Sequence, residues 1–274
     1  MVIRKITDSN YDTTIGTIRR NDNAEAYLAA PDSQYFTSIN GVLYSKDVSK
    51  LLAVPKAMKG TLFLPKETKF IYMSALYKSS LNTIIGEGVT RVFSSAFEQS
   101  TIQNCYLPSV DKIGKRAFYQ CTELHHIDLC QVFVIEADAF SSSGLFGLTI
   151  PVTTRIINGS FDYCDSLAWV IVRDRTSNDP PLLLGNHAFE GCYNLKDFTF
   201  KEGKLNLKGS VFKENYSLKD VVFPAVDVIP DSTFVKCTSL MSITIGSECQ
   251  IPKNLKRSKV KIEMYNKDQL RFEV

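Results

Sequence analysis

The sequence predicts a right-handed, β-rich solenoid of the α/β class, with one short parallel strand plus a turn or short helix in every coil. Three observations predict it: a phenylalanine that recurs roughly every 22 residues, a small polar residue three positions later, and an apolar triplet after that. A single unit of this kind cannot bury its apolar face alone, whereas stacked neighbours can. The fold is therefore expected to be a stack of coils around a shared core.

The phenylalanines define the coils. Successive members are 21, 22, 21, 28, 23 and 22 residues apart, at Phe97, Phe118, Phe140, Phe161, Phe189, Phe212 and Phe234. Leu76 lies 21 residues before Phe97 and takes the same place in the first unit. We expect these bulky side chains to anchor each coil to its neighbours.

The small polar position between the phenylalanine and the triplet is expected to satisfy the backbone of a tight turn. It is occupied by Ser79, Ser100, Cys121, Ser143, Cys164, Cys192, Asn215 and Cys237. Such side chains donate to or accept from backbone groups. Four of the seven cysteines are therefore copies of one position, and we expect buried thiols that act as small hydrophobes, without a column of disulfides.

The apolar triplet predicts a strand. In units such as Leu124, Ile127 and Leu129, the last two apolar residues are two positions apart, so they share one face of a strand. The residues between and before them then face outward. Several outward positions of the array carry aromatic, imidazole or carboxylate side chains that could contact a partner: Tyr106, His126, Asp128, Trp169, Asp197 and Asp220.

Three units carry the pattern A-F-x-x-C-x-x-L-x-x-I-x-L most clearly: AFYQCTELHHIDL (117–129), AFEGCYNLKDFTF (188–200) and TFVKCTSLMSITI (233–245). This pattern resembles the BspA-like, or treponemal-type, leucine-rich repeat, and the resemblance covers residues 36–250. Segment 36–55 also resembles the hairpin that often opens such arrays. The resemblance implies a leucine-rich-repeat solenoid that serves adhesion or host interaction at a cell surface.

The segments at the two ends lack the repeat. We expect an N-terminal arm or partial coil over 1–35, a β-hairpin cap and first coil over 36–75, the array over 76–250, and a C-terminal cap over 251–274. The long spacing before Phe189 places extra residues in 173–186, which Pro180 and Pro181 make an extended loop. The basic C-terminal segment is expected to be a solvated cap, and an anionic docking patch is the alternative.

No catalytic residue, cofactor or metal site is predicted. The sequence contains no nucleophile elbow, Walker-type phosphate loop or zinc-protease motif. His126 and Asp128 could begin a metal site or an acid–base pair, but the equivalent position Asn104 offers no further imidazole or carboxylate, so a solvated strand face is favoured. A net charge of +3 argues against nucleic acid as a partner. No apolar segment predicts a signal peptide or membrane insertion.

We therefore expect a non-enzymatic protein–protein interaction module whose partner-binding residues are Tyr106, His126, Asp128, Trp169, Asp197 and Asp220. An aromatic side chain on an open face is typical of binding hot spots. The resemblance implies a host or cell-surface protein as partner. Two alternatives stay open: an intracellular scaffold or regulator, which the missing signal and the free cysteines favour, and a carbohydrate-binding face. The sequence leaves the oligomeric state open.

Overall fold

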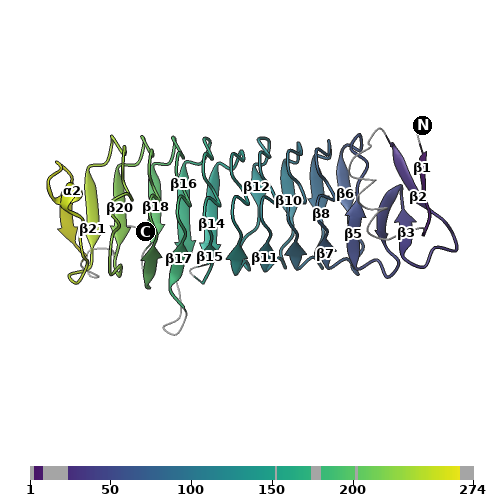
Figure 1. Ribbon diagram of the computed structural model, residues 1–274, viewed down its shortest axis with the longest axis horizontal. Coiled ribbons are helices and arrows are strands. Elements are labelled where there is room, and N and C mark those ends of the chain that lie inside the picture. The colour runs from purple at the N-terminus through teal and green to yellow at the C-terminus, as the bar shows by residue number, and fades with distance from the viewer. Residues whose placement is uncertain (1–2, 9–23, 152, 174–179, 201–202, 266–274) are drawn as a thin grey trace. The chain divides into compact units, whose positions relative to one another are not determined.

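A computed structural model describes residues 3–8, 24–151, 153–173, 180–200 and 203–265. The chain divides into two compact units, residues 1–145 and 146–274, and each is built from stacked coils (Figure 1). The predicted solenoid is confirmed. Each typical coil carries the predicted strand and, in addition, a second strand of two or three residues on another side. Turns, rather than a helix, connect the two strands in most coils.

Unit 1 begins with two strands that pair in parallel, β1 (Ile3–Ile6) and β2 (Ala26–Ala29). A short antiparallel sheet follows, formed by β3 (Phe36–Ile39), β4 (Val42–Ser45) and β5 (Lys50–Ala53). The strands predicted within segment 36–55 are therefore present. Residues 9–23 of the predicted N-terminal arm lie outside the described residues.

The coils of unit 1 place their strands in two parallel sheets. One has the order β12-β10-β8-β6, comprising β6 (Thr61–Phe63), β8 (Thr83–Ile85), β10 (Asn104–Tyr106) and β12 (His126–Ile127). The other continues from β5 through β7 (Phe70–Ile71), β9 (Arg91–Val92), β11 (Lys112–Ile113) and β13 (Val134–Ile135). We call these the long-strand and short-strand sheets.

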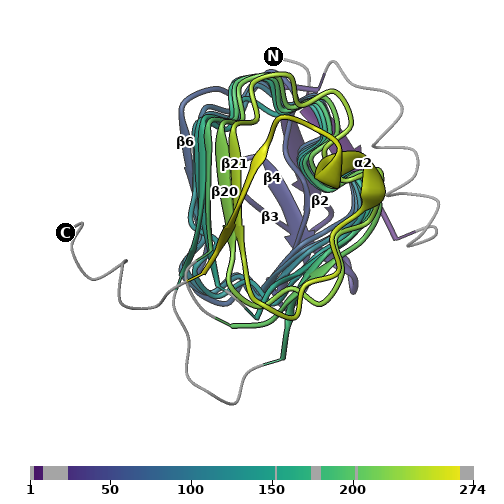
Figure 2. The ribbon, with the colours of Figure 1, turned by 90° about the vertical axis from the view of Figure 1, so that its left-hand side faces the viewer.

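Unit 2 repeats the arrangement. Its long-strand sheet has the order β14 (Gly147–Pro151), β16 (Trp169–Arg173), β18 (Asp197–Phe200), β20 (Asp220–Phe223), β21 (Ser242–Ile245) and β22 (Lys261–Met264), all parallel. Its short-strand sheet has the order β15 (Arg155–Ile156), β17 (Leu182–Leu184) and β19 (Leu205–Leu207). Figure 2 is viewed along the direction in which the coils stack, so that β20 and β21 lie one behind the other.

The described residues contain one helix, α2 (Lys253–Lys256), which belongs to the predicted C-terminal cap together with β22. Residues 266–274 of that cap lie outside the described residues. The expectation of an extended loop over 173–186 is wrong for Leu182–Leu184, because these residues form β17 with Leu182 and Leu184 fully buried. Residues 174–179 of the predicted loop are not described. The predicted segment boundaries stay a prediction.

The recurring phenylalanines form a stacked column inside each unit. In unit 1 the ring of Phe118 lies 4.6 Å from that of Phe97 and 5.0 Å from that of Phe140, with interplanar angles of 11° and 1°. In unit 2 the ring of Phe189 lies 5.2 Å from that of Phe161 and 5.9 Å from that of Phe212. All six rings are fully buried. Burial of each such side chain contributes about 1.5–3 kcal/mol, which explains the regular spacing in the sequence.

Each phenylalanine of the series except Phe234 is held in a turn with a left-handed residue on either side. Ser95 and Gln99, two residues before and after Phe97, have φ angles of 56° and 60°. The amides of Ser95 and Gln99 donate to carbonyls of the next coil, at Lys115 and Tyr119. A left-handed residue costs about 1–2 kcal/mol, and these hydrogen bonds between coils offset that cost. The side of the coils where the turns lie is called the turn edge below.

The small polar position works as predicted and with one further detail. In four coils its side chain donates to the carbonyl oxygen of the preceding coil's phenylalanine: Cys121 Sγ to Phe97 at 3.0 Å, Cys192 Sγ to Phe161 at 3.1 Å, Asn215 Nδ2 to Phe189 at 2.7 Å, and Cys237 Sγ to Phe212 at 2.9 Å. A buried carbonyl without a partner would cost about 1–3 kcal/mol. The position therefore selects small donors.

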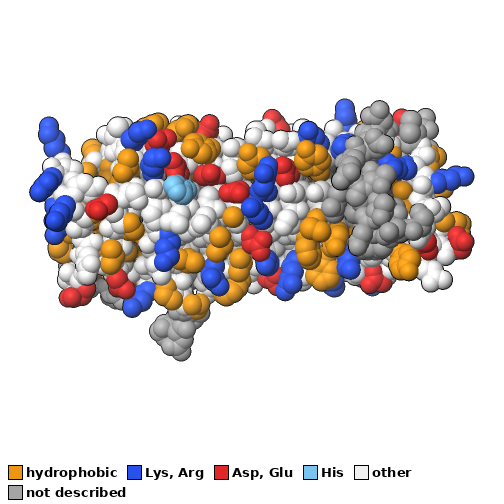
Figure 3. Space-filling view, in the orientation of Figure 1, with side chains coloured by type: hydrophobic (Ala, Val, Ile, Leu, Met, Phe, Trp, Pro, Cys, Tyr) orange, Lys and Arg blue, Asp and Glu red, His pale blue; other side chains and the backbone are white. Residues whose placement is uncertain are grey.

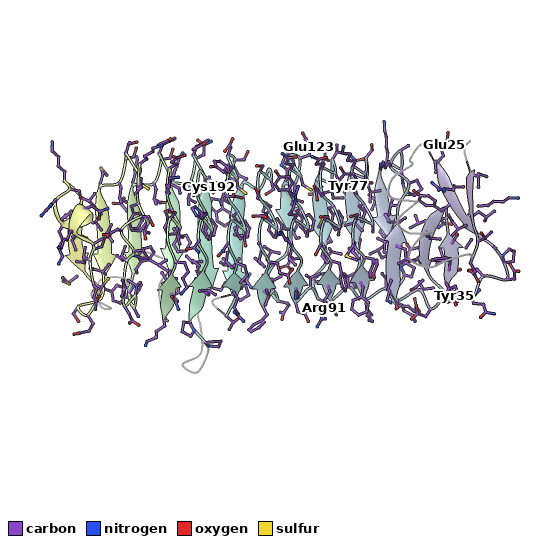
Figure 4. The ribbon with its side chains drawn as sticks, viewed as in Figure 1. Glu25, Tyr35, Tyr77, Arg91, Glu123 and Cys192 are labelled. Atoms are coloured by element: carbon purple, nitrogen blue, oxygen red, sulfur yellow. The ribbon has the colours of Figure 1, made fainter. Side chains whose placement is uncertain are left out.

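All seven cysteines lie in the described residues, and none of them forms a disulfide. Burial raises the pKa of Cys121 and of Cys237 to about 12, and it also raises the pKa of Cys105 and Cys192 well above the usual range. Cys192 is labelled in Figure 4. These four thiols stay protonated at neutral pH, which makes them poor nucleophiles.

Candidate functional site

The outward face of the unit 1 long-strand sheet carries a row of apolar side chains, of which Phe63 and Tyr106 are exposed and Ile85 is half-buried. Phe63, Ile85 and Tyr106 are paired in register on β6, β8 and β10. The inward neighbours Ile84 and Cys105 are fully buried, whereas Phe63 is 69% exposed and Tyr106 46% exposed. Because adjacent parallel strands lie about 4.8 Å apart, the three side chains form one continuous patch. We call it the unit 1 apolar row.

His126 extends this row by one strand. Its ring lies 5.2 Å from the ring of Tyr106, tilted by 39°. The sequence placed His126 and Asp128 on one strand face, but β12 ends at Ile127, and Asp128 lies in the following turn. There its carboxylate accepts a hydrogen bond of 2.8 Å from the Cys130 amide. The structure therefore brings Tyr106 and His126 together, and it gives Asp128 a role in the turn.

Trp169, the single tryptophan, lies on the outward face of unit 2. A Cβ atom added at Gly147 on the neighbouring strand would be 2.1 Å from Trp169 Cε2 and 2.2 Å from Cζ2. The indole therefore lies flat across the Gly147 backbone and is half-buried there. Glycine at position 147 is required by this close approach, and one face of the indole is used within the fold.

Two carboxylates follow Trp169 in register. Trp169 is paired with Asp197 on β18, and Asp197 is paired with Asp220 on β20. Both aspartates are exposed, and Asp220 accepts a hydrogen bond of 2.6 Å from Ser242 Oγ on β21. Like charges directly opposite each other on neighbouring strands are destabilising. We call Asp197 and Asp220 the acidic pair; a cationic group on a partner would relieve their repulsion.

Phe63 was missed by the sequence reasoning. Its coil precedes Leu76, the first member of the phenylalanine series, so the outward columns were counted from the next strand onward. A signal was present: Leu64-Pro65 repeats the apolar-proline step that follows the strand at Leu107-Pro108.

A ladder of tyrosines on the turn edge of unit 2 was also missed. The ring of Tyr193 lies 5.3 Å from Tyr216 in a stacked arrangement and 6.5 Å from Tyr163 in an edge-on one. Tyr163 and Tyr216 are 42% and 39% exposed. The available signal was a tyrosine at or next to the small polar position of three consecutive coils. Figure 4 shows Glu123 at the top of unit 1, Tyr77 below it, and Arg91 of β9 near the lower side.

A buried carboxylate ties the coils of unit 2 together beside this ladder. Glu190, 7% exposed at its side chain, accepts a hydrogen bond of 2.7 Å from Lys213 and contacts His187. Burial alone would raise the pKa of Glu190, but the hydrogen bonds from Lys213 and His187 hold it below its usual value. Glu214 continues the network, because Lys236 lies 2.7 Å from its carboxylate. These contacts join neighbouring coils, because Glu190, Lys213 and Lys236 come from three successive coils.

No group of three or more His, Cys, Asp or Glu side chains in the described residues is arranged to hold a metal ion. The described part of the chain also contains no helix with the length and apolar character needed to cross a bilayer. What the outward faces offer chemically is an apolar row and an acidic pair on rigid sheets.

The comparisons with known proteins agree with this geometry. The family model for the BspA type leucine rich repeat region, in six copies, matches residues 60–168 and 176–264. No curated protein matches the chain.

Solved structures resemble the chain. A leucine rich repeat protein of T. pallidum matches with 23% identity and a TM-score of 0.53, over 69% of this chain and 90% of that one. A leucine rich cell surface protein from Faecalibacterium prausnitzii A2-165 matches with 19% identity and a TM-score of 0.40, over 86% and 96%. The pneumococcal vaccine antigen PcpA matches with 16% identity and a TM-score of 0.43, over 89% of this chain. The chain spans about half of the PcpA structure, 51%. The chain belongs to the BspA type leucine rich repeat family.

Proposed function

We propose that this chain is a non-catalytic protein-interaction module that binds a protein partner through the outward faces of its long-strand sheets. The observation that carries the proposal is the unit 1 apolar row on a parallel sheet, in which Phe63 and Tyr106 are exposed and Ile85 between them is half-buried. Exposed apolar side chains that are contiguous, rather than scattered, mark interaction sites. The strands hold these side chains in place, so binding orders few additional groups.

The residues predicted from the sequence contribute in two groups. In unit 1, Tyr106 supplies a large amphipathic ring and His126 lies beside it. In unit 2, Trp169 supplies the half-buried indole and the acidic pair supplies negative charge for a basic side chain. Tyrosine and tryptophan are the residue types that dominate binding energy at protein interfaces. Asp128 contributes by holding the turn after β12.

The test is recovery of partners from the native source with the wild-type chain, a Phe63→Ala/Tyr106→Ala double variant and a Tyr216→Ala control. Tyr216 is about as exposed as Tyr106 but lies on the turn edge. We expect the double variant to lose the specifically recovered protein and the control to retain it. Equal recovery by all three chains would exclude the unit 1 apolar row as the contact surface.

We propose that the module acts at a cell surface, as the membership of the BspA type repeat family suggests. Protease treatment of intact cells tests the location, since a surface protein is cleaved. A protein that stays protected would support the intracellular scaffold instead.

A carbohydrate-binding face is the second candidate function. It is favoured by one observation, the indole of Trp169 lying flat beside the carboxylate of Asp197. Aromatic faces combined with hydrogen-bond acceptors suit sugar rings. A glycan array in which Trp169→Ala abolishes a wild-type signal would support it, and an array without any signal would exclude it.

A further inference from the structure

The phenylalanine column of unit 2 ends with an unfilled space. Phe161, Phe189 and Phe212 are fully buried, but the last ring, Phe234, is only half-buried. The next equivalent position, 21 residues later, is Leu255 in the four-residue helix α2. Leucine is smaller than phenylalanine, so the cap covers the end of the column incompletely.

A cavity of about 220 Å³ lies between the last coil and the cap. Its apolar walls come from Phe234 and Leu240 on the coil side and from Pro252, Leu255 and Val260 on the cap side. A cavity of about 150 Å³ with apolar walls holds benzene, so this one has room for an aromatic ring. Phe212 and Phe234 stack with centroids 5.8 Å apart, and a ring in the cavity would continue that stack.

The rim of this cavity is mostly basic, although one acidic residue, Asp231, lines it together with Lys236. Lys253, Lys256, Arg257 and Lys259 alternate along the chain with the residues that line the cavity, and all four side chains are exposed. None of the four forms an ion pair with another residue that the structure describes. Residues 251–265 hold five basic residues and one acidic residue, a net charge of +4. Figure 3 shows Lys and Arg side chains gathered at the end that carries α2.

We infer that the C-terminal cap binds an acidic segment of a protein partner that inserts one aromatic side chain between Phe234 and Leu255. The cavity selects the ring, and the basic rim selects the flanking carboxylates. A polyphosphate or an anionic polysaccharide would pair with the lysine and arginine side chains of the rim but would leave the apolar walls of the cavity exposed to water. This surface is separate from the unit 1 apolar row, so the inference does not rest on the proposed function of that row.

The test uses the full chain and two labelled pentapeptides, Asp-Glu-Phe-Glu-Asp and Asp-Glu-Ala-Glu-Asp, with binding followed by fluorescence anisotropy. We expect the phenylalanine peptide to bind at least about ten-fold more tightly than the alanine peptide, because burial of a phenylalanine side chain contributes binding free energy equivalent to at least about that factor. Higher ionic strength should weaken both peptides. These comparisons use only the wild-type chain, so they stand whether or not any variant folds.

Two variants separate the ring from the charges. Leu255→Phe fills the cavity and should reduce the affinity for the phenylalanine peptide to that of the alanine peptide. Lys256→Glu/Arg257→Glu should weaken the binding of both peptides at least about ten-fold. Lys196→Glu, at an exposed lysine three coils earlier, should change neither affinity by more than about two-fold.

Four outcomes would overturn the inference. The first is no binding of either peptide at millimolar concentration, and the second is equal binding of the two. The third is displacement of the phenylalanine peptide by single-stranded DNA at equal charge, which would indicate a general polyanion site. The fourth is tighter peptide binding by a Phe272→Ala variant, which would assign the cavity to the chain's own last residues. Loss of peptide binding with retained partner recovery by the unit 1 apolar row would leave the proposed function intact.

Discussion

Substitution of Gly147 by alanine should displace the only tryptophan of the chain. The added Cβ atom would lie 2.1 Å from Trp169 Cε2, whereas ordinary contacts are 3.4–4 Å, so the indole must move by at least about 1.3 Å. A ring lifted off the backbone of β14 loses about 40–80 Å² of buried area, which at about 25 cal/mol per Å² corresponds to about 1–2 kcal/mol of stability.

The assay is direct because no other tryptophan contributes to the signal. We expect the emission of Gly147→Ala to shift to longer wavelength, its quenching by iodide to increase, and its urea midpoint to fall. Gly209→Ala is the matched control in the same unit, since its Cβ would meet nothing closer than the flexible Ser232 hydroxyl at 3.2 Å. An unchanged emission maximum, quenching and midpoint in Gly147→Ala would refute the flat placement of the indole.

Three further predictions concern stability, and urea or thermal unfolding measures each. Leu255→Phe should raise the free energy of unfolding by about 1 kcal/mol because a cavity of about 220 Å³ adjoins Leu255. Leu76→Phe should lower the free energy of unfolding through overpacking, since Leu76 is only 1% exposed. A stabilised Leu76→Phe with a destabilised Leu255→Phe would contradict this. Asn215→Ala should lower the free energy of unfolding by about 1–3 kcal/mol because the Phe189 carbonyl loses its hydrogen-bond donor. Asn215→Cys should lose much less stability, because a thiol can donate to the same carbonyl; equal losses in the two variants would contradict the assigned role. The pKa of Glu190 is lowered in the folded state, so its contribution to the free energy of unfolding is complete above its ordinary pKa of 4.5 and is lost as the pH falls from that value through the lowered pKa. Glu190→Gln should flatten this loss of stability in acid. An unchanged slope of stability against pH would show that the carboxylate is not responsible.

The sequence allowed the long-strand sheets to be predicted because their signal is local. Two inward residues two positions apart, such as Cys105 and Leu107, identify a strand without knowledge of its neighbours. The small polar position could likewise be read as a turn donor, since Ser, Cys and Asn share that capacity. Its acceptor, the phenylalanine carbonyl of the preceding coil, depends on how coils stack and is visible only in the structure.

Other features depend on partners far apart in the sequence. The short-strand sheets have members of two or three residues, too short for a periodic signal, and Leu182–Leu184 form β17 through pairing with β15 and β19. The flat placement of Trp169 requires the missing side chain of Gly147, 22 residues earlier. Phe63 was not assigned to the outward face from the sequence, because its coil lacks the recurring phenylalanine that identifies the other coils.

The central claim is that the outward strand face, and not exposed tyrosine in general, binds the partner. The most direct measurement is the dissociation constant of the recovered partner for the wild-type chain, Tyr106→Ala and Tyr216→Ala, two tyrosines 46% and 39% exposed. We predict that Tyr106→Ala weakens binding about ten-fold or more and that Tyr216→Ala changes it by less than about two-fold. Equal effects, or a larger effect of Tyr216→Ala, would contradict the account.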